Sequence, residues 1–259
     1  MNSTTKLPKS MPKSLTNTQA MRYNRHIVLP QVDLDGQEAL LNAHAVVIGV
    51  GGLGTAAATS LCASGVGKIT LIDFDIVEQT NLPRQTLYKE DDVNKRKVDA
   101  GATHLKALNS HCEINVVTVP FDNSHQDIIA DANVVLDCTD NVECRDVINT
   151  LCFNTQTPLV SGAAIRFEGQ LFVAIPGKSR CYGCLRKLFN EPNLSCVEAG
   201  IFSPVVNIIG TYQAMLAMQV LMGFDNLPLN QLITFDGLRH EWQHWTLPDG
   251  LTCSLCSSD

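Results

Sequence analysis

A glycine-rich turn between a strand-like and a helix-like segment constrains this chain more than any other feature of its sequence. Residues 44–49 are a short apolar run rich in β-branched side chains, and residues 55–64 follow an alanine-rich helical pattern. The turn between them reads GVGGLG and fits the nucleotide-binding pattern GxGxxG. Such glycines let the backbone approach a phosphate, whose charge the helix N terminus favours. We predict a nucleotide site here, against the alternative of a purely structural turn. Its glycines are Gly49, Gly51, Gly52 and Gly54.

The same alternation of strand and helix patterns continues through the first 160 residues. Apolar strand patterns occupy residues 68–73, 113–119, 134–137 and 159–160, and helical patterns occupy residues 94–108 and 142–154. Repeated βα units with nearly continuous apolar strands predict a doubly wound, mostly parallel, Rossmann-like α/β sheet with helices on both faces.

The pattern changes after residue 160. Residues 165–175 predict a hairpin or extended β segment, residues 204–222 an apolar helix, and residues 231–246 two more strands. No linker divides the chain, so residues 21–259 are predicted to form a single domain. Residues 1–20 are rich in Lys, Ser, Thr, Asn and Pro and lack acidic residues, which predicts a disordered N-terminal extension.

Charge and composition exclude several classes of protein. A net charge of -7 argues against a nucleic-acid binder, because phosphate backbones are held by concentrated Lys and Arg. No apolar run approaches the roughly 20 residues that span a bilayer, and the first twenty residues lack a signal-peptide pattern, so we expect a cytoplasmic protein without a membrane partner. In that reducing compartment, the ten cysteines are expected to be buried, reactive or metal-bound rather than disulfides.

Charged residues around the predicted turn indicate which nucleotide is bound. Asp73 ends the next strand, where a carboxylate can accept hydrogen bonds from ribose hydroxyls, a feature that suits NAD as well as ATP. Arg84 and Lys97 favour ATP, because cleavage of a triphosphate develops negative charge that positioned cations stabilise. The alternative for both cations is an ordinary place on the surface.

A second carboxylate follows another apolar strand. Asp140 comes shortly after residues 134–137, at the carboxyl end of the sheet where open α/β folds bind ligands. A hard oxygen ligand there can hold Mg²⁺ on the phosphates. Asp140 and its neighbours are also good helix N-caps, so the sequence leaves a magnesium ligand and a capping residue as equal alternatives.

Four cysteines have the spacing of a metal site. They form two CxxC pairs, which suit a tetrahedral Zn²⁺ bound by four thiolates with no open position for chemistry. We therefore predict a structural zinc that joins the chain end to the core, in preference to a redox pair. The predicted ligands are Cys181, Cys184, Cys253 and Cys256.

Together these motifs resemble a known family. The sequences RYNR at 22–25, LIDFD at 71–75, NLPRQT at 81–86, DCTDN at 137–141 and SGAAIR at 161–166, with the glycine loop, are similar to those of the MoeB, ThiF and HesA group, bacterial relatives of the ubiquitin-activating enzymes. The resemblance extends from about residue 20 to Cys256. Residues 161–170 and 196–200 look more like MoeB members than ThiF members.

The resemblance implies an activity and a set of site residues. The activity is ATP-dependent adenylation of the C-terminal glycine of a ubiquitin-like sulfur-carrier protein ending in Gly-Gly, here the molybdopterin synthase small subunit. A homodimer is also implied, in which Arg25 reaches the triphosphate of the neighbouring subunit. The residues implied to contact ATP are Gly52, Asp73, Asn81, Arg84, Lys97, Asp140 and Asn141.

Three alternatives remain open on the sequence. The partner can instead be a thiamine-pathway carrier; the protein can be an NAD-dependent oxidoreductase; or it can be a scaffold without catalysis, against which the joint retention of Arg84, Lys97 and Asp140 argues. Relatives that form covalent intermediates use a cysteine in the region of Cys196, whereas MoeB-type adenylation does not depend on one.

Overall fold

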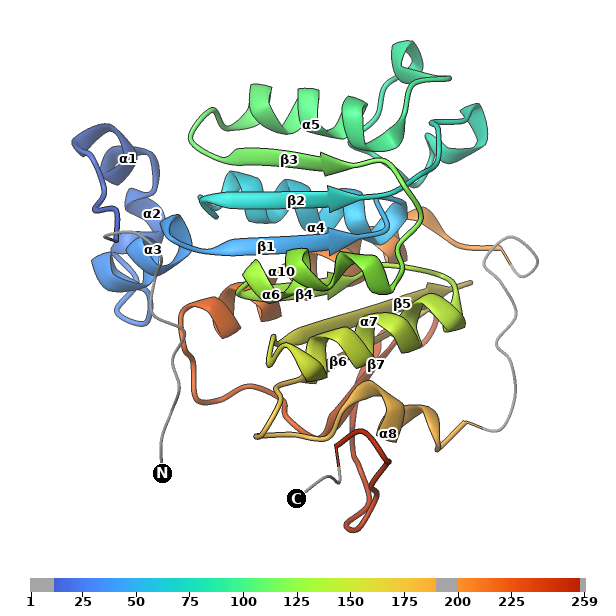
Figure 1. The fold of residues 1–259 in the computed structure, drawn as a ribbon. Coiled ribbons are helices and arrows are strands. Elements are labelled where there is room, and N and C mark those ends of the chain that lie inside the picture. Colours follow the sequence, from blue (N-terminus) through green and yellow to red (C-terminus); the bar gives the residue numbers. More distant parts are fainter. Residues whose placement is uncertain (1–11, 190–199, 257–259) are drawn as a thin grey trace.

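The computed structural model describes residues 12–189 and 200–256, which form one eight-stranded sheet in the order β3-β2-β1-β4-β5-β6-β7-β8 (Figure 1). The strands are β1 His44–Ile48, β2 Lys68–Ile72, β3 Glu113–Val117, β4 Val134–Asp137, β5 Leu159–Ile165, β6 Glu168–Ala174, β7 Gln231–Asp236 and β8 Glu241–Thr246. β3 to β5 in this order pair in parallel, whereas β5 to β8 pair antiparallel. The predicted mostly parallel sheet is confirmed.

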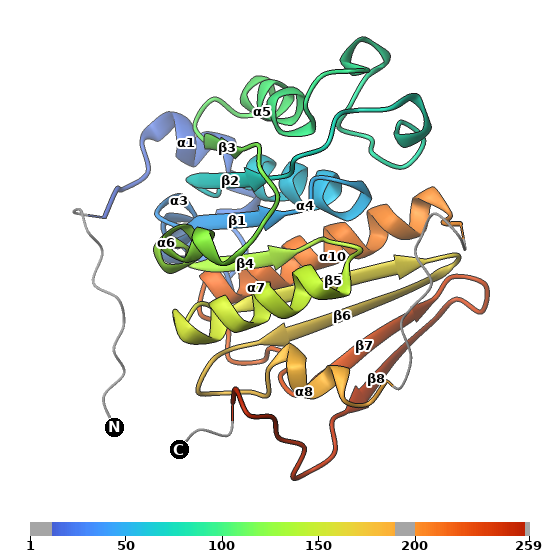
Figure 2. The same cartoon turned by 45° about the vertical axis from the view of Figure 1, so that its right-hand side comes forward.

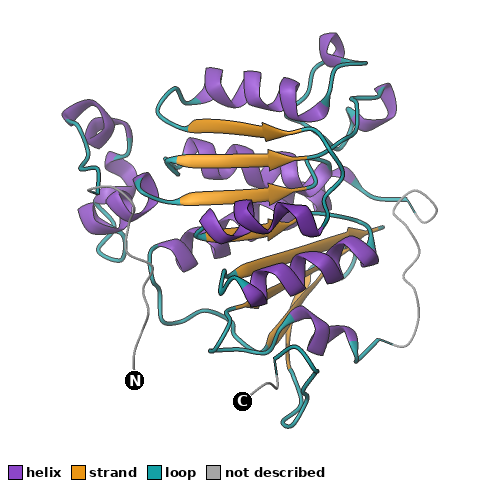
Figure 3. Cartoon of the chain, viewed as in Figure 1, coloured by secondary structure: helices purple, strands orange, loops and turns teal. Residues whose placement is uncertain are grey.

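Helices cover both faces of the parallel half (Figure 3). α4, α5 and α10 pack against one face in the larger apolar cluster, and α6 and α7 pack against the other face. Because both faces are covered, β1 is buried along its whole length and consists of apolar residues apart from His44. The helices are α1 Asn17–Arg22, α2 Asn24–Ile27, α3 Asp33–Leu41, α4 Gly52–Ala63, α5 Lys97–Leu108, α6 Gln126–Asp131, α7 Val142–Asn154, α8 Tyr182–Arg186 and α10 Ser203–Leu221, with 3-10 turns η1 Gln79–Asn81, η2 Glu90–Asp92 and η3 Asn123–His125.

α10 is an apolar helix in the core. Among the described residues it is the one helix whose length and composition would also suit a membrane span. It packs against α4 and against β4, β5 and β6, and its buried side chains belong to the larger apolar cluster. Its buried Gln213 donates hydrogen bonds of 2.8 Å to the carbonyl oxygens of Asp137 and Val160. These contacts account for its apolar composition, as expected for a core helix.

In the antiparallel half, β5 and β6 still pack against α10, and β7 and β8 lie beyond them (Figure 2). β5 and β6 form the predicted hairpin, which turns at Arg166 with a positive φ of 52°. β7 and β8 extend it to the sheet edge, and all six residues of β8 are exposed. The last described residues return from β8 to lie beside α8.

Part of the predicted N-terminal extension is ordered. Residues 1–11 lie outside the described residues, but Asn17 begins α1, so the expected disorder does not reach residue 20. The helix begins with a capping box in which Thr16 and Gln19 satisfy each other's backbone amides. Before it, the Lys13 amide donates to Asn42 Oδ1 at 2.7 Å. Hydrogen bonds, rather than apolar burial, hold this segment.

Candidate active site

The glycine loop connects the end of β1 to the start of α4, as predicted. Gly49 has a φ of 83°, a conformation that side chains disfavour, and Gly51 precedes the helix without a side-chain cap. A Cβ on Gly54 would lie 1.9 Å from the Gly49 carbonyl oxygen, so only glycine allows α4 to start this close to the strand. The positive end of α4 therefore lies at the carboxyl ends of the parallel strands.

A cavity of about 1710 Å³ opens at these strand ends. Most of the predicted nucleotide-binding residues line it, although they come from five separate segments of the chain. Those lining the cavity are Gly49, Gly51, Gly52, Asp73, Asn81, Arg84, Lys97, Asp140 and Asn141. Gly54 is buried beneath the loop and shapes it from below.

Asp73 connects the glycine loop to the segment after β2. Its Oδ2 accepts a hydrogen bond of 2.7 Å from the Val50 amide, and its Oδ1 accepts one of 2.9 Å from the Asp75 amide. Burial raises the pKa of the Asp73 carboxyl, and the nearby positive charge of Lys97 only partly opposes that shift. The carboxylate is thus fixed in place at the cavity wall, where its remaining lone pairs can accept hydrogen bonds from hydroxyl groups.

The two predicted cations are restrained by neighbours. The buried Lys97 forms an ion pair of 2.7 Å between its Nζ and Asp75 Oδ2. The half-buried Arg84 donates from Nη1 to the Thr80 carbonyl oxygen at 2.9 Å. Both side chains line the cavity in these positions.

The structure assigns the capping role to Asn141 rather than to Asp140. Asn141 is the N-cap of α7, and its side chain accepts a hydrogen bond of 2.9 Å from the Cys144 amide. Asp140 is exposed to the cavity, and within residues 12–189 and 200–256 its carboxylate has no hydrogen bond or ion pair. Magnesium typically binds one or two carboxylates together with substrate phosphates and water. The Asp140 carboxylate, at a candidate phosphate site, fits that chemistry.

Arg25 lies far from this cavity within one chain. It is exposed on α2, and Figure 1 shows α1 to α3 beside the amino ends of the strands, opposite the carboxyl ends where the cavity opens. The structure therefore does not bring Arg25 together with the other predicted site residues. Cys196 falls outside the described residues.

The structure brings two further residues, Gln85 and Arg145, to the same place, although no role was predicted for either. Gln85 is 3% exposed beside the glycine loop, and its Oε1 has no hydrogen-bond partner among the described residues. Arg145 is buried on α7 between the ends of β4 and β5. The only signal for either was proximity in sequence, since Gln85 directly follows Arg84 and Arg145 lies one helical turn after Asn141.

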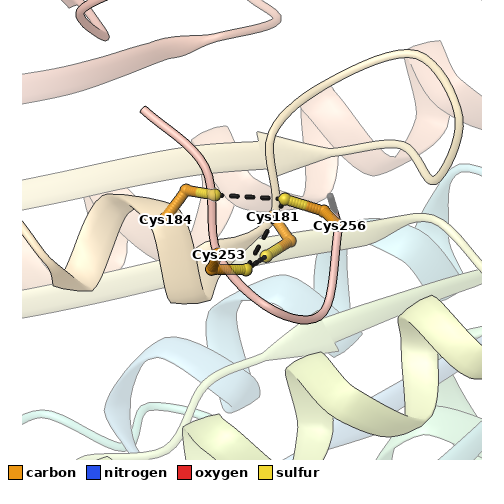
Figure 4. A group of neighbouring side chains, drawn as sticks. All are labelled: Cys181, Cys184, Cys253 and Cys256. Atoms are coloured by element: carbon orange, nitrogen blue, oxygen red, sulfur yellow. Dashed lines mark hydrogen bonds between the residues drawn. The ribbon is translucent and has the colours of Figure 1, made fainter. Parts of the chain in front are cut away.

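The four predicted zinc ligands meet where the start of α8 faces the last described turn of the chain (Figure 4). Their Sγ atoms all lie within 4.8 Å of one another, and neighbouring pairs lie 3.1 to 3.5 Å apart. Thiolates around zinc, with Zn–S bonds of about 2.3 Å in a tetrahedron, lie about 3.8 Å apart. The arrangement of Cys181, Cys184, Cys253 and Cys256 therefore fits a closed four-thiolate metal site that joins α8 to the last described turn.

Comparison with known proteins identifies the family. The model of the ThiF family matches residues 23–255. This chain belongs to the ThiF family. It is 41% identical to the molybdopterin-synthase adenylyltransferase of Escherichia coli K12, with 93% of this chain and 98% of that protein covered. It is 39% identical to the sulfur carrier protein ThiS adenylyltransferase of the same organism, over 91% of this chain and 94% of that protein.

A solved structure supports the assignment at the level of the fold. Escherichia coli MccB, crystallised with ATP, superposes with a TM-score of 0.75 at 25% identity. The superposition covers 86% of this chain and 69% of MccB. The likeness to MccB therefore includes the mixed sheet, at whose strand ends the cavity opens.

Proposed function

We propose that this protein uses ATP to adenylate the C-terminal glycine carboxylate of a ubiquitin-like sulfur-carrier protein ending in Gly-Gly, the small subunit of molybdopterin synthase. One observation carries the proposal: a glycine loop, a ribose-type carboxylate, two restrained cations and an unpartnered carboxylate converge on a single cavity. The 41% identity to a molybdopterin-synthase adenylyltransferase over nearly all of both chains supports the choice of carrier.

The reaction joins the carrier to AMP. A carboxylate oxygen of the carrier attacks the α-phosphorus of ATP, an O–P bond forms, and the bond from that phosphorus to the bridging oxygen breaks as pyrophosphate leaves with the electron pair. A terminal carboxyl has a pKa of about 3.5 and is ionised at neutral pH, so no general base is needed. Catalysis then consists of positioning the two reactants and neutralising charge.

The cavity residues divide these two tasks. The glycine loop and the N terminus of α4 receive the phosphates, while Asp73 accepts hydrogen bonds from the ribose hydroxyls. Arg84 and Lys97 stabilise the charge that develops on pyrophosphate. Asn81 and Asn141 contribute polar contacts from the two sides of the cavity.

Asp140 is proposed as the magnesium ligand. Its carboxylate lines the cavity that also contains Arg84 and Lys97, and the capping role that competed with this assignment belongs to Asn141. Magnesium bound there would neutralise charge on the phosphates. The protein itself contributes one hard oxygen ligand and leaves the remaining positions to ATP and water.

We further propose a homodimer with a composite site. Arg25 sits at the end of the sheet opposite the cavity, so it can serve a nucleotide site only in another copy of the chain. Residues 21–259 act as one adenylating domain, with a structural zinc bound by the four-cysteine cluster. The protein works in the cytoplasm without nucleic-acid or membrane partners.

Two rival activities follow from specific observations. The 39% identity to a ThiS adenylyltransferase favours a thiamine-pathway carrier as the second candidate partner. A glycine loop followed by Asp73 also suits NAD, but an NAD-dependent oxidoreductase gives no task to Arg84, Lys97 and Asp140 at the phosphate end of the cavity.

Carrier-dependent exchange of labelled pyrophosphate into ATP tests these possibilities. The purified protein is assayed with the molybdopterin-synthase and thiamine-pathway carriers in parallel, with Asp140→Ala as control. Exchange with the first carrier alone, lost in the variant, supports the proposal. Exchange with the second alone assigns the protein to thiamine synthesis, and exchange with neither, together with NADH binding, supports the oxidoreductase.

A further inference from the structure

A buried guanidinium holds the turn that carries Asp140. Arg145 is 7% exposed near the start of α7, and its Nη2 donates to the carbonyl oxygens of Thr139 and Gly162, the latter at 2.9 Å. Thr139 immediately precedes Asp140, and Gly162 belongs to β5 on the neighbouring wall of the cavity. One side chain therefore ties together two walls of the site.

A buried carboxylate holds the same turn from its other side. Asp137 ends β4, and its Oδ1 accepts hydrogen bonds from the amide and the hydroxyl of Thr139 at 3.1 and 2.7 Å. Its Oδ2 accepts a hydrogen bond of 2.8 Å from Ser161 and lies 3.4 Å from Arg145 Nη1. The turn between β4 and α7 is thus closed by the ion pair of Arg145 and Asp137, and both oxygens of the carboxylate accept hydrogen bonds.

Packing alone does not require such a network. Removing two charges from water costs several kcal/mol per ion, and a well-packed apolar pair is often at least as stable. Burial opposes the charge on Arg145, but the Asp137 carboxylate raises its pKa, so the guanidinium remains charged. What this pair supplies, and an apolar pair lacks, is a fixed direction for the Thr139 carbonyl and hence for the next residue.

We propose that Arg145 is a positioning residue for Asp140. It holds the turn so that the Asp140 carboxylate points into the cavity in one orientation, while Asn141 fixes the other flank by capping α7. Arg145 also lines the cavity, but its guanidinium donates to Thr139, Ser161 and Gly162, so it acts on Asp140 through the turn. The inference rests on the function proposed above, which gives Asp140 the task of holding magnesium on the triphosphate.

Two variants loosen the turn without removing Asp140. Lysine keeps a charge opposite Asp137 but lacks the fork that spans two carbonyl oxygens. Arg145→Lys should slow carrier-dependent exchange by about 10- to 100-fold, the scale expected for misplacement by about 1 Å. It should also reduce the extra rise in melting temperature that Mg²⁺ adds to ATP, without changing the rise given by ATP in EDTA. Thr139→Val removes one hydroxyl bond to Asp137 and should shift both quantities less, and it serves if Arg145→Lys fails to fold.

The decisive comparison uses the Asp140→Ala background. If Arg145 acts through Asp140, then Arg145→Lys/Asp140→Ala is no slower than Asp140→Ala alone, because coupled residues do not contribute independently. Losses that multiply in full in the double variant overturn the inference.

Asn149→Ala is the matched control. Asn149 is buried one turn further along α7, and its Oδ1 accepts a hydrogen bond of 2.9 Å from the Tyr182 amide. It should lower the melting temperature and leave the magnesium increment intact.

The melting-temperature measurement tests the role of Arg145 separately from the proposed function. It requires only ATP and Mg²⁺, so it tests Arg145 whether or not a carrier supports exchange. An unchanged magnesium increment in both Arg145→Lys and Thr139→Val overturns the positioning role. Absence of exchange by the unchanged protein with every carrier overturns the proposed function.

Discussion

Substitution of Gly52 by alanine should destabilise the protein through one side chain, Val206, and truncation of that side chain should relieve the damage. A Cβ at residue 52 would lie 2.3 Å from Val206 Cγ1 but 3.5 Å from Val206 Cβ. Val206 is 2% exposed, in the larger apolar cluster. Forcing a methyl group into such packing costs about 1–3 kcal/mol. We therefore expect Gly52→Ala to lower the free energy of unfolding by about 2 kcal/mol.

The double variant gives the sharper test. Val206→Ala alone removes two buried methyl groups and should also cost about 2 kcal/mol. In Gly52→Ala/Val206→Ala the new methyl group occupies the vacated space. The total loss should then be about 2 kcal/mol rather than the roughly 4 kcal/mol that independent effects would give. Equilibrium unfolding of the four proteins in urea measures this difference directly.

Gly54→Ala provides the contrast. Its Cβ would meet the Gly49 carbonyl oxygen at 1.9 Å, and a backbone atom cannot be removed by substitution. Val206→Ala should therefore bring no relief to Gly54→Ala. The reasoning is refuted if Gly52→Ala unfolds like the unchanged protein, or if its loss and that of Val206→Ala simply add.

Three further predictions concern the metal, one carboxylate and one amide. If the proposed zinc is bound by the four cysteines, a zinc chelator, or Cys253→Ser, should lower the melting temperature and first increase hydrogen exchange in α8, which the cluster joins to the last described turn. Burial of Asp92 opposes its ionisation, but hydrogen bonds, chiefly from His104, lower its pKa to about 2. Its stabilisation of about 2 kcal/mol is therefore complete above the unfolded pKa of about 3.9 and is lost as the pH falls toward 2. The stability gap to Asp92→Asn should be constant from about pH 7 to 5 and smaller at about pH 3 in urea unfolding. Gln85→Met should raise the melting temperature, because a buried oxygen without a donor costs about 1–3 kcal/mol.

Each of these three predictions would be contradicted by one result. A melting temperature unaffected by the chelator would contradict the proposed structural zinc. A gap between Asp92→Asn and the unchanged protein that widens below about pH 4 would contradict the sign of the pKa shift. A lower melting temperature for Gln85→Met would mean that the amide has a stabilising partner.

The parallel half of the fold could be predicted because each of its strands and main helices has its own pattern of apolar residues in the sequence. β1 and β4 read as apolar runs since both faces of the sheet are covered, and α7 was predicted with the bounds Val142–Asn154 that it has. The helices α3 and α6 were not predicted. α3 contains Gly36 and three acidic residues and buries only three side chains, and α6 is six residues long, so neither has a clear apolar period.

The sequence identified the cavity residues that belong to a motif, but not those that only tertiary contacts bring to the cavity. Asp73, Arg84 and Lys97 follow the glycine loop in readable patterns, and the cavity brings them together. The network of Arg145 includes contacts to Ser161 and Gly162, 16 and 17 residues away on β5, and the ends of β4 and β5 meet only in the folded sheet. Likewise, the sequence left Asp140 as cap or ligand, and only the observed hydrogen bond from the Cys144 amide to Asn141 shows that Asn141 is the cap, while the ligand role of Asp140 stays a prediction.

Intact-mass measurement of the carrier detects the proposed adenylation itself. The molybdopterin synthase small subunit is incubated with this protein, ATP and Mg²⁺ in the presence of pyrophosphatase, and its mass and C-terminal peptide are recorded. The account predicts a carrier heavier by one AMP moiety on its terminal glycine, absent without ATP and with Arg84→Ala. A carrier of unchanged mass, under conditions where the protein is folded and binds ATP, would contradict it.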